Sequence, residues 1–266
     1  MSALSASNSS GASDGEITQT CIALLQEGQA LELHGNVPGA IAKYNEILAL
    51  SQGVQHEVQR QDIKSAAVGN LGTAYDSLGQ YDKAIEHYDQ GLAISREIGD
   101  RRGEGNHLGN LGIAYSRLGQ CDKAIEHYDQ ALAISREIGD RRGEGNHLGN
   151  LGNAYDDLGQ YDKAIEHHNQ ALTISREIGD RPGEGNHLGN LGNAYDSLGQ
   201  YDKAIEHYNQ ALAISREIGH RQGEGNHLGS LGSAYYSLGQ YDKAIEHHNQ
   251  ALTISREIGD RRGEGN

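Results

Sequence analysis

Residues Gly149–Leu188 read GNLGNAYDDLGQYDKAIEHHNQALTISREIGDRPGEGNHL, and this stretch recurs along the chain with a period of 40 residues. Equivalent residues form columns, for example Tyr75, Tyr115, Tyr155, Tyr195 and Tyr235, and Ala84, Ala124, Ala164, Ala204 and Ala244. A period of this length is typical of a solenoid, in which each unit buries its apolar face against the next. A feature present in every copy was duplicated with it, so each column counts as one observation.

The composition of the 266-residue chain excludes several classes of function. There is no Trp and no Phe, so Leu, Ile, Ala and the 14 Tyr must form the core. The net charge of −15 argues against nucleic acid and anionic membranes as partners, because both attract clusters of Lys and Arg. Cys21 and Cys121 offer no disulfide framework, and the N-terminal residues lack the basic and apolar segments of a signal peptide. We therefore expect a cytoplasmic protein.

Three regions are expected along the chain. Residues 1–14 are rich in Ser and Gly and predict a disordered tail. Residues 15–68 predict a diverged first repeat with a longer joint, because Ala40 corresponds to Ala84 at a spacing of 44 residues. The array proper is expected over 69–266, with units at 69–108, 109–148, 149–188, 189–228 and 229–266, the last followed by the start of a truncated helix.

Apolar residues at three- and four-residue steps predict two helices in each unit. Gly119 is expected to end the first helix of the third unit and Gly139 the second, because glycine adopts the left-handed conformation at helix ends. Asp140 is the expected N-cap of the helix that follows. Pro38 and Pro182 are expected in first turns, where a helix tolerates proline.

The motif residues of the third unit are Leu108-x-x-Leu111-Gly112-x-x-Tyr115 and Ala124-x-x-x-Tyr128-x-x-Ala131. This pattern resembles the tetratricopeptide repeat, with Leu in place of its first Trp. The chain departs from the family pattern in having His168 and His248 in the second aromatic column and Arg136 where a proline often closes the repeat. The likeness covers about residues 17–266 and implies an all-α fold, a right-handed α-solenoid of antiparallel helix hairpins (TPR superhelix).

The repeat length and the linker GDRRGEGN are similar to those of G-protein-signalling modulators of the Partner of Inscuteable type and, less closely, kinesin light chains. The first likeness implies a role in G-protein or polarity signalling. The short G-protein-binding motifs that follow the repeats in those proteins are not found in this chain.

We find no constellation of catalytic or metal-ligating residues and expect a non-enzymatic protein without a cofactor. The stretch GEGNHLGNLG follows a segment of helical period, whereas a dinucleotide fingerprint must follow a strand. The histidine columns at His107 and His167 are interpreted as surface or boundary residues, and the evenly spread carboxylates as a solvated face. The glycine column that contains Gly72 and Gly192 is expected to let two helices approach closely.

Asparagines form the candidate binding face. Asn146, Asn150, Asn153 and Asp157 follow one line, about 180° around the helix from the leucine stripe. In tetratricopeptide arrays this face of the first helix lines the concave groove, and the donors and acceptor of an amide suit the backbone of an extended peptide. The alternative is an inert polar face that duplication has multiplied. The predicted groove residues are Asn110, Asn146, Asn150, Asn153, Asp157, Asn186, Asn190 and Asn193.

The sequence thus predicts a protein-interaction scaffold that binds a protein or peptide partner and neither nucleic acid nor a membrane. A second hypothesis is a structural or sensor array that is a fragment of a larger multidomain protein, because residues 263–266 fall inside what should be a further first helix. An uncapped C-terminal end also predicts self-association.

Overall fold

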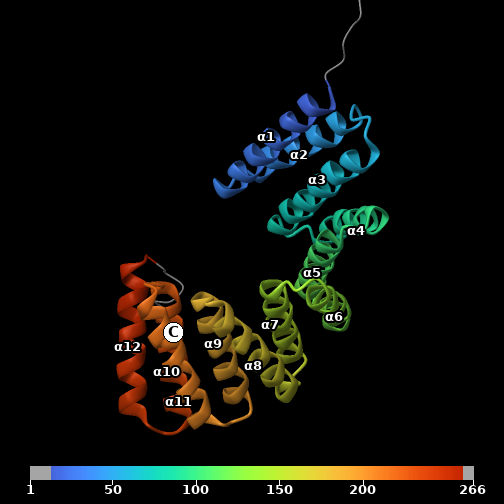
Figure 1. The fold of residues 1–266 in the computed structure, drawn as a ribbon. Coiled ribbons are helices and arrows are strands. Elements are labelled where there is room, and N and C mark those ends of the chain that lie inside the picture. The colour runs from blue at the N-terminus through green and yellow to red at the C-terminus, as the bar shows by residue number, and fades with distance from the viewer. Residues whose placement is uncertain (1–12, 260–266) are drawn as a thin grey trace, which may run out of the picture. The chain divides into compact units, whose positions relative to one another are not determined.

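The computed structural model describes residues 13–259, and this part of the chain contains twelve α-helices and no strand (Figure 1). The predicted all-α repeat solenoid is confirmed. The helices are α1 (Asp14–Leu33), α2 (Val37–Ser51), α3 (Glu57–Ser77), α4 (Tyr81–Ile98), α5 (Arg101–Arg117), α6 (Cys121–Glu137), α7 (Arg141–Asp157), α8 (Tyr161–Ile178), α9 (Arg181–Ser197), α10 (Tyr201–Glu217), α11 (Arg221–Ser237) and α12 (Tyr241–Glu257).

Two of the expected segments fall largely outside the described residues. Residues 1–12 of the expected tail and residues 260–266, where the start of a truncated helix is predicted, are not described. Ser13 and Asp14 belong to the start of α1: the Ser13 side chain accepts a hydrogen bond from the backbone N–H of Glu16, and the Glu16 carboxylate accepts one from the backbone N–H of Ser13. This reciprocal capping box explains why α1 begins there.

The chain forms two compact units, residues 1–120 with α1–α5 and residues 121–266 with α6–α12. Within each unit, every helix packs against the next helix in the chain. The odd-numbered first helices also touch one another in sequence, α1 with α3 and α3 with α5 in the first unit, and α7 with α9 and α9 with α11 in the second. Each unit therefore has a layer of first helices and a layer of second helices.

The helix ends follow the predicted capping signals. Gly119 and Gly139 adopt φ angles of 70° and 71°, a left-handed conformation that glycine takes without a steric penalty. Asp140 caps α7, and its side chain accepts a hydrogen bond from the N–H of Gly143 at 2.9 Å. Pro38 and Pro182 lie in the first turns of α2 and α9, as expected.

In both units, the core of a hairpin depends on a glycine that faces an aromatic ring. Leu188 and Leu191 of α9 are buried, as the leucine stripe predicts. A Cβ at Gly192 would lie 2.4 Å from Cε1 of Tyr208, and a Cβ at Gly72 would lie 2.4 Å from Cε1 of Tyr88. The expected close approach at this glycine column is confirmed, because only a residue without a side chain leaves room for the ring.

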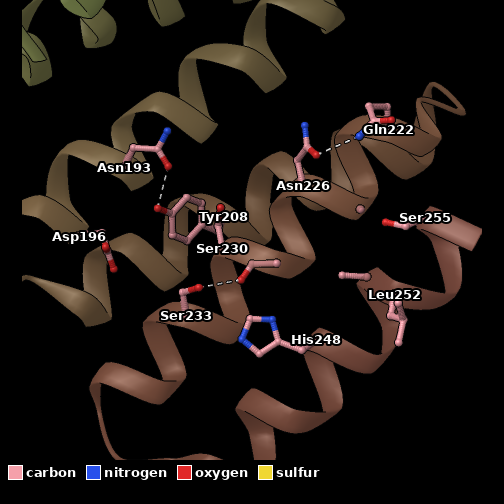
Figure 2. A pocket seen from close by; sticks show the side chains of 13 residues that line it. Asn193, Asp196, Tyr208, Gln222, Asn226, Ser230, Ser233, His248, Leu252 and Ser255 are labelled. Atoms are coloured by element: carbon pink, nitrogen blue, oxygen red, sulfur yellow. Dashed lines mark hydrogen bonds between the residues drawn. The ribbon is translucent and has the colours of Figure 1, made fainter. Parts of the chain in front are cut away.

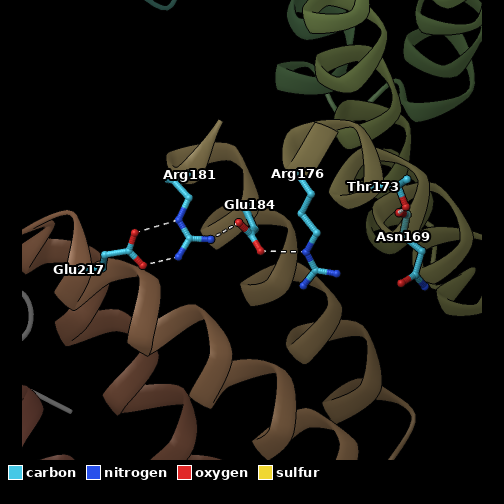
Figure 3. Close-up of polar contacts among 6 residues, drawn as sticks. All are labelled: Asn169, Thr173, Arg176, Arg181, Glu184 and Glu217. Atoms are coloured by element: carbon cyan, nitrogen blue, oxygen red, sulfur yellow. Dashed lines mark hydrogen bonds and ion pairs between the residues drawn. The ribbon is translucent and has the colours of Figure 1, made fainter. Parts of the chain in front are cut away.

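The interpretation of the carboxylates as a solvated face is wrong for one column. Glu104, Glu144, Glu184 and Glu224, near the front of four first helices, are only 7–8% exposed. Figure 3 shows Glu184 between two arginines: Arg176 donates to its Oε1 at 2.8 Å, and Arg181 donates to its Oε2. Arg181 also pairs with Glu217 of α10. These bonds tie the glycine-rich front of α9 to its neighbours.

The interpretation of the histidines as surface or boundary residues is also wrong in part. His107 of α5 is 6% exposed, whereas His147 and His187 of the same column are half-buried. The other column is half-buried: the ring of His167 stacks on Tyr155 with centroids 5.2 Å apart, and Lys163 lies 4.9 Å from the centre of the same tyrosine ring. Burial lowers the pKa of His167 and of His107. Both columns hold helices together.

Among the residues that the structure describes, no helix is long and apolar enough to cross a membrane.

Candidate functional site

The asparagine line lies on the first helices, away from the leucine core. In α7, Asn146, Asn153 and Asp157 are exposed and Asn150 is half-buried, whereas Leu148 is buried. The equivalent residues Asn186, Asn190 and Asn193 of α9 follow the same pattern. Asn110 of α5 is half-buried. The structure therefore places all eight predicted groove residues at partly or fully accessible positions.

Asparagines of successive first helices are in direct contact. Asn190 of α9 donates through Nδ2 to Oδ1 of Asn153 in α7 at 2.9 Å. This bond joins the two helices side by side along the line that the sequence predicts. In the first unit Gln29 of α1 donates in the same way to Oδ1 of Asn70 in α3 at 3.4 Å. In each unit, an amide–amide bond therefore joins two successive first helices.

The second helices reach this surface through a buried tyrosine. Tyr208 of α10 is 3% exposed, and its hydroxyl donates to Oδ1 of Asn193 at 2.8 Å (Figure 2). Because Asn193 accepts this bond through its oxygen, its NH₂ group is left to face outward as a donor. The sequence did not indicate this contact, since Tyr208 belongs to the apolar column of the second helix.

Among the described residues of each unit, a pocket opens on the polar face. In the first unit a pocket of about 500 Å³ lies between α3 and α5, and its lining includes Asn70, Asn106 and Asn110. In the second unit a pocket of about 780 Å³ is lined by Asn193, Asn226 and other residues of α9–α12. Figure 2 shows that polar side chains of α9 and α11 border this second pocket.

Carboxylates one turn beyond the asparagines complete the surface. Asp156 of α7 and Asp196 of α9 are half-buried, and Asp196 lines the pocket of the second unit. None of the described residues forms a hydrogen bond with Oδ1 of either carboxylate. Burial raises the pKa of both aspartates, and their charges add to the effect of burial in raising the pKa of Tyr208. Sequence reasoning missed them, although an aspartate three residues after Asn153 lies on the same helical face.

Within the described part of the chain, no group of three or more His, Cys, Asp or Glu side chains could hold a metal ion. The site therefore consists of amides, hydroxyls and carboxylates on a surface of packed helices. Such groups can position a partner's backbone and side chains by hydrogen bonds and charge.

These features define a helical-repeat protein whose first helices present a polar face. The tetratricopeptide repeat family model matches residues 63–137, 143–217 and 185–257, which together cover most of the chain. The chain therefore belongs to the tetratricopeptide repeat family. No curated protein matches the sequence.

Solved structures with a similar fold come from several kinds of protein. The nearly identical repeats of a putative kinesin light chain from Podosopora anserina align with a TM-score of 0.63 at 24% identity, covering 73% of this chain and 95% of that one. A Rap protein complexed with competence and sporulation factor aligns at 0.71 and 20% identity, covering 96% and 70%. The signal-transduction ATPase with a tetratricopeptide repeat sensor from Pyrococcus horikoshii aligns at 0.76 and 21% identity, covering 90% of this chain and 37% of that one. At these identities the likeness shows the fold.

Proposed function

We propose that this protein is a non-enzymatic scaffold that binds an extended peptide segment of a partner along the asparagine line of its first helices. The observation that carries the proposal is the bond between Asn190 and Asn153, which makes the amides of successive helices one surface. Asparagine is a poor helix former, so a dense line of it lowers helix stability unless it serves another purpose. The similar Rap structure was determined as a complex, which supports a fold of this kind holding a partner.

The test separates binding from stability. The variant Asn150→Ala/Asn153→Ala/Asn190→Ala/Asn193→Ala removes the amides from two successive first helices. Losing three or four hydrogen bonds to a partner, at about 0.5–1.5 kcal/mol each, should weaken binding at least ten-fold. The gain in helix propensity offsets the lost bonds within the protein, so the melting temperature should change little.

The matched control changes four exposed asparagines of second helices to alanine: Asn45, Asn169, Asn209 and Asn249. The Nδ2 groups of Asn169 and Asn209 bond to carbonyl groups of their own helices, those of Ile165 and Ile205. Partners captured by the parent protein should bind the control variant with unchanged affinity. If both variants retain full affinity, the binding site is on another surface.

A role in G-protein or polarity signalling is the narrower form of this proposal, and it rests on the resemblance of the repeats alone. The second candidate function is a sensor array within a larger protein. It is favoured by the Pyrococcus horikoshii ATPase, in which a comparable array is described as a sensor and this chain matches 37% of the length. This candidate would be favoured if the array were found in the cell as part of a longer chain that carries a switch domain, and if the array bound no separate partner.

A further inference from the structure

Two amide donors face outward at equivalent positions of neighbouring first helices. Asn153 of α7 and Asn193 of α9 are exposed, and each uses its Oδ1 within the protein. Asn153 accepts from Asn190 at 2.9 Å, and Asn193 accepts from the hydroxyl of Tyr208 at 2.8 Å (Figure 2). Neither NH₂ group donates to another of the described residues. An amide that is held by its oxygen can still donate both of its N–H groups to a ligand.

The same position on the other first helices of the array offers no outward amide. Its residues are Thr73 in α3, Ile113 in α5 and Ser233 in α11. The hydroxyl of Thr73 donates to the carbonyl of Gly69, and that of Ser233 to the carbonyl of Gly229, each at 3.2 Å. These two donors are therefore used inside their own helices, and Ile113 has none. The pair of outward donors is specific to α7 and α9.

The spacing of the two donors discriminates between conformations of a bound chain. The helices α7 and α9 are in contact, and packed helices lie about 8–10 Å apart. A β-strand directs the carbonyls of alternate residues to the same side, so these carbonyls repeat at about 7 Å or about 13 Å. A polyproline II helix has three residues per turn and places carbonyls on the same side about every 9 Å. The spacing of first helices therefore matches polyproline II and not a β-strand.

The polarity of the two amides favours a partner that is rich in proline. Because Asn153 and Asn193 act as donors, they require carbonyl oxygens from the partner and none of its N–H groups. Proline keeps its carbonyl, lacks the N–H and fixes φ near the polyproline II value. A chain that already has the bound conformation also loses less conformational entropy on binding than a flexible chain does.

We propose that α7 and α9 bind a proline-rich segment of the partner in the polyproline II conformation. The carbonyls of residues i and i+3 of this segment accept hydrogen bonds from Nδ2 of Asn153 and Nδ2 of Asn193. This inference rests on the proposed function and names the chemistry and the conformation of the partner.

The experiment measures the fluorescence anisotropy of a labelled (Ser-Pro-Pro)₄ peptide as the full chain is added. The comparison peptide (Ser-Gly-Gly)₄ has the same number of carbonyls and an N–H at every residue, but no preferred conformation. The proline peptide should bind at least ten-fold more tightly, because less of its chain has to be ordered. Its mirror image, built from D-residues, has the same composition and the opposite hand and should also bind at least ten-fold more weakly. Equal or tighter binding of either comparison peptide, or no binding of the proline peptide, overturns the inference.

An isosteric pair of variants tests the two donors directly. In Asn153→Asp/Asn193→Asp the carboxylates can still accept from Asn190 and Tyr208, so both internal bonds are kept. Each outward donor becomes an acceptor that faces a carbonyl oxygen, and affinity for the proline peptide should fall at least ten-fold. Circular dichroism checks that the variant is folded. Unchanged affinity overturns the inference.

The matched control places the same two charges elsewhere. Asn169→Asp/Asn209→Asp changes exposed asparagines of α8 and α10, and affinity for the uncharged proline peptide should stay the same. If this control loses as much affinity as the variant of the first helices, the loss comes from charge and not from the two donors, and the inference is overturned.

Failure of this inference can be distinguished from failure of the proposed function. The alanine variant of the four groove asparagines may weaken the binding of captured partners while the parent protein does not bind the proline peptide. The groove then holds a chain of another conformation, which overturns this inference and leaves the proposed function intact. If the alanine variant binds both the captured partners and the proline peptide as tightly as the parent does, both proposals are wrong.

Discussion

The hairpins α7–α8 and α9–α10 are near copies, yet they differ at the ring that faces the first helix. In α9–α10 the hydroxyl of Tyr208 reaches the polar face and donates to Asn193 at 2.8 Å. In α7–α8 the equivalent residue is His168, which is 1% exposed and whose Nδ1 has no partner among the residues described. Asn153, the counterpart of Asn193, accepts instead from Asn190 of the next repeat. One substitution in the second helix therefore changes how an asparagine on the first helix is held.

Both rings depend on a glycine opposite them. A Cβ at Gly152 would lie 2.6 Å from Cε1 of His168, and a Cβ at Gly192 would lie 2.4 Å from Cε1 of Tyr208. The comparison teaches that this glycine column accepts either ring, and that the ring decides whether the second helix is hydrogen-bonded to the asparagine face. Each prediction below tests one part of this difference.

The largest effect is expected from Gly192→Ala. The added methyl group meets the rigid ring of Tyr208, and overpacking of this kind costs about 1–3 kcal/mol of stability, partly offset by the gain of up to about 1 kcal/mol from replacing a helical glycine. Urea unfolding followed by circular dichroism measures the change. The matched control is Gly229→Ala in α11, where a Cβ meets nothing within 4 Å and the propensity gain should appear alone. A net gain in both variants would show that Tyr208 is not packed on Gly192.

The next effect is the pH dependence that His168 introduces. Burial lowers its pKa to about 3, whereas an unfolded histidine has a pKa of about 6.5. Between these two pKa values the unfolded state binds more protons than the folded state. The contribution of neutral His168 to the free energy of unfolding is therefore fully present above pH 6.5 and is lost as the pH falls toward 3. In this range the free energy of unfolding should fall by about 1.4 kcal/mol for each pH unit that the pH is lowered, for one histidine.

The variant His168→Tyr should remove this one-proton slope, and Tyr208→His should add it. Urea unfolding at pH 7.5, 6 and 5 measures the slopes for the parent and the two variants. Burial also lowers the pKa values of His147 and His227, which are common to all three proteins. The ring of His187 lies 6.0 Å from that of His168 and its charge lowers the pKa of His168, so the slope lost in His168→Tyr belongs to this pair. Identical slopes in parent and His168→Tyr would mean that His168 is solvated in solution.

The two hairpins also show how far the sequence could predict the molecule. Periodicity determines which residues share a face and where helices end, so the helix pairs, the Asp140 cap and the asparagine line were predictable. Periodicity does not determine how deep a position lies in the packed array. His107 and Glu184 are therefore buried where the sequence suggested boundary and surface residues.

Contacts between repeats were the least predictable part. The pairing of Arg181 with Glu217 spans 36 positions and depends on the alignment of two repeats, which local pattern does not specify. The bond from Tyr208 to Asn193 likewise depends on the close approach at Gly192. The chemistry of the candidate site thus came from the packing between helices, and the scaffold came from the repeat.

The smallest effect is expected from Tyr208→Phe, which keeps the ring and removes the hydroxyl. Loss of the bond to Asn193 should cost about 0.5–1.5 kcal/mol, with a value near the lower end because water can reach the exposed Asn193 side chain and replace the lost donor. A double-mutant cycle with Asn193→Ala measures the interaction directly: the two changes should be coupled by about 0.5–1 kcal/mol, since each removes the same bond. The cycle of His168→Phe with Asn153→Ala is the matched control, and its coupling should be close to zero, because Asn153 bonds to Asn190 and not to His168. Equal coupling in the two cycles would mean that the ring does not decide how the asparagine is held, and the difference between the hairpins would then be confined to the core.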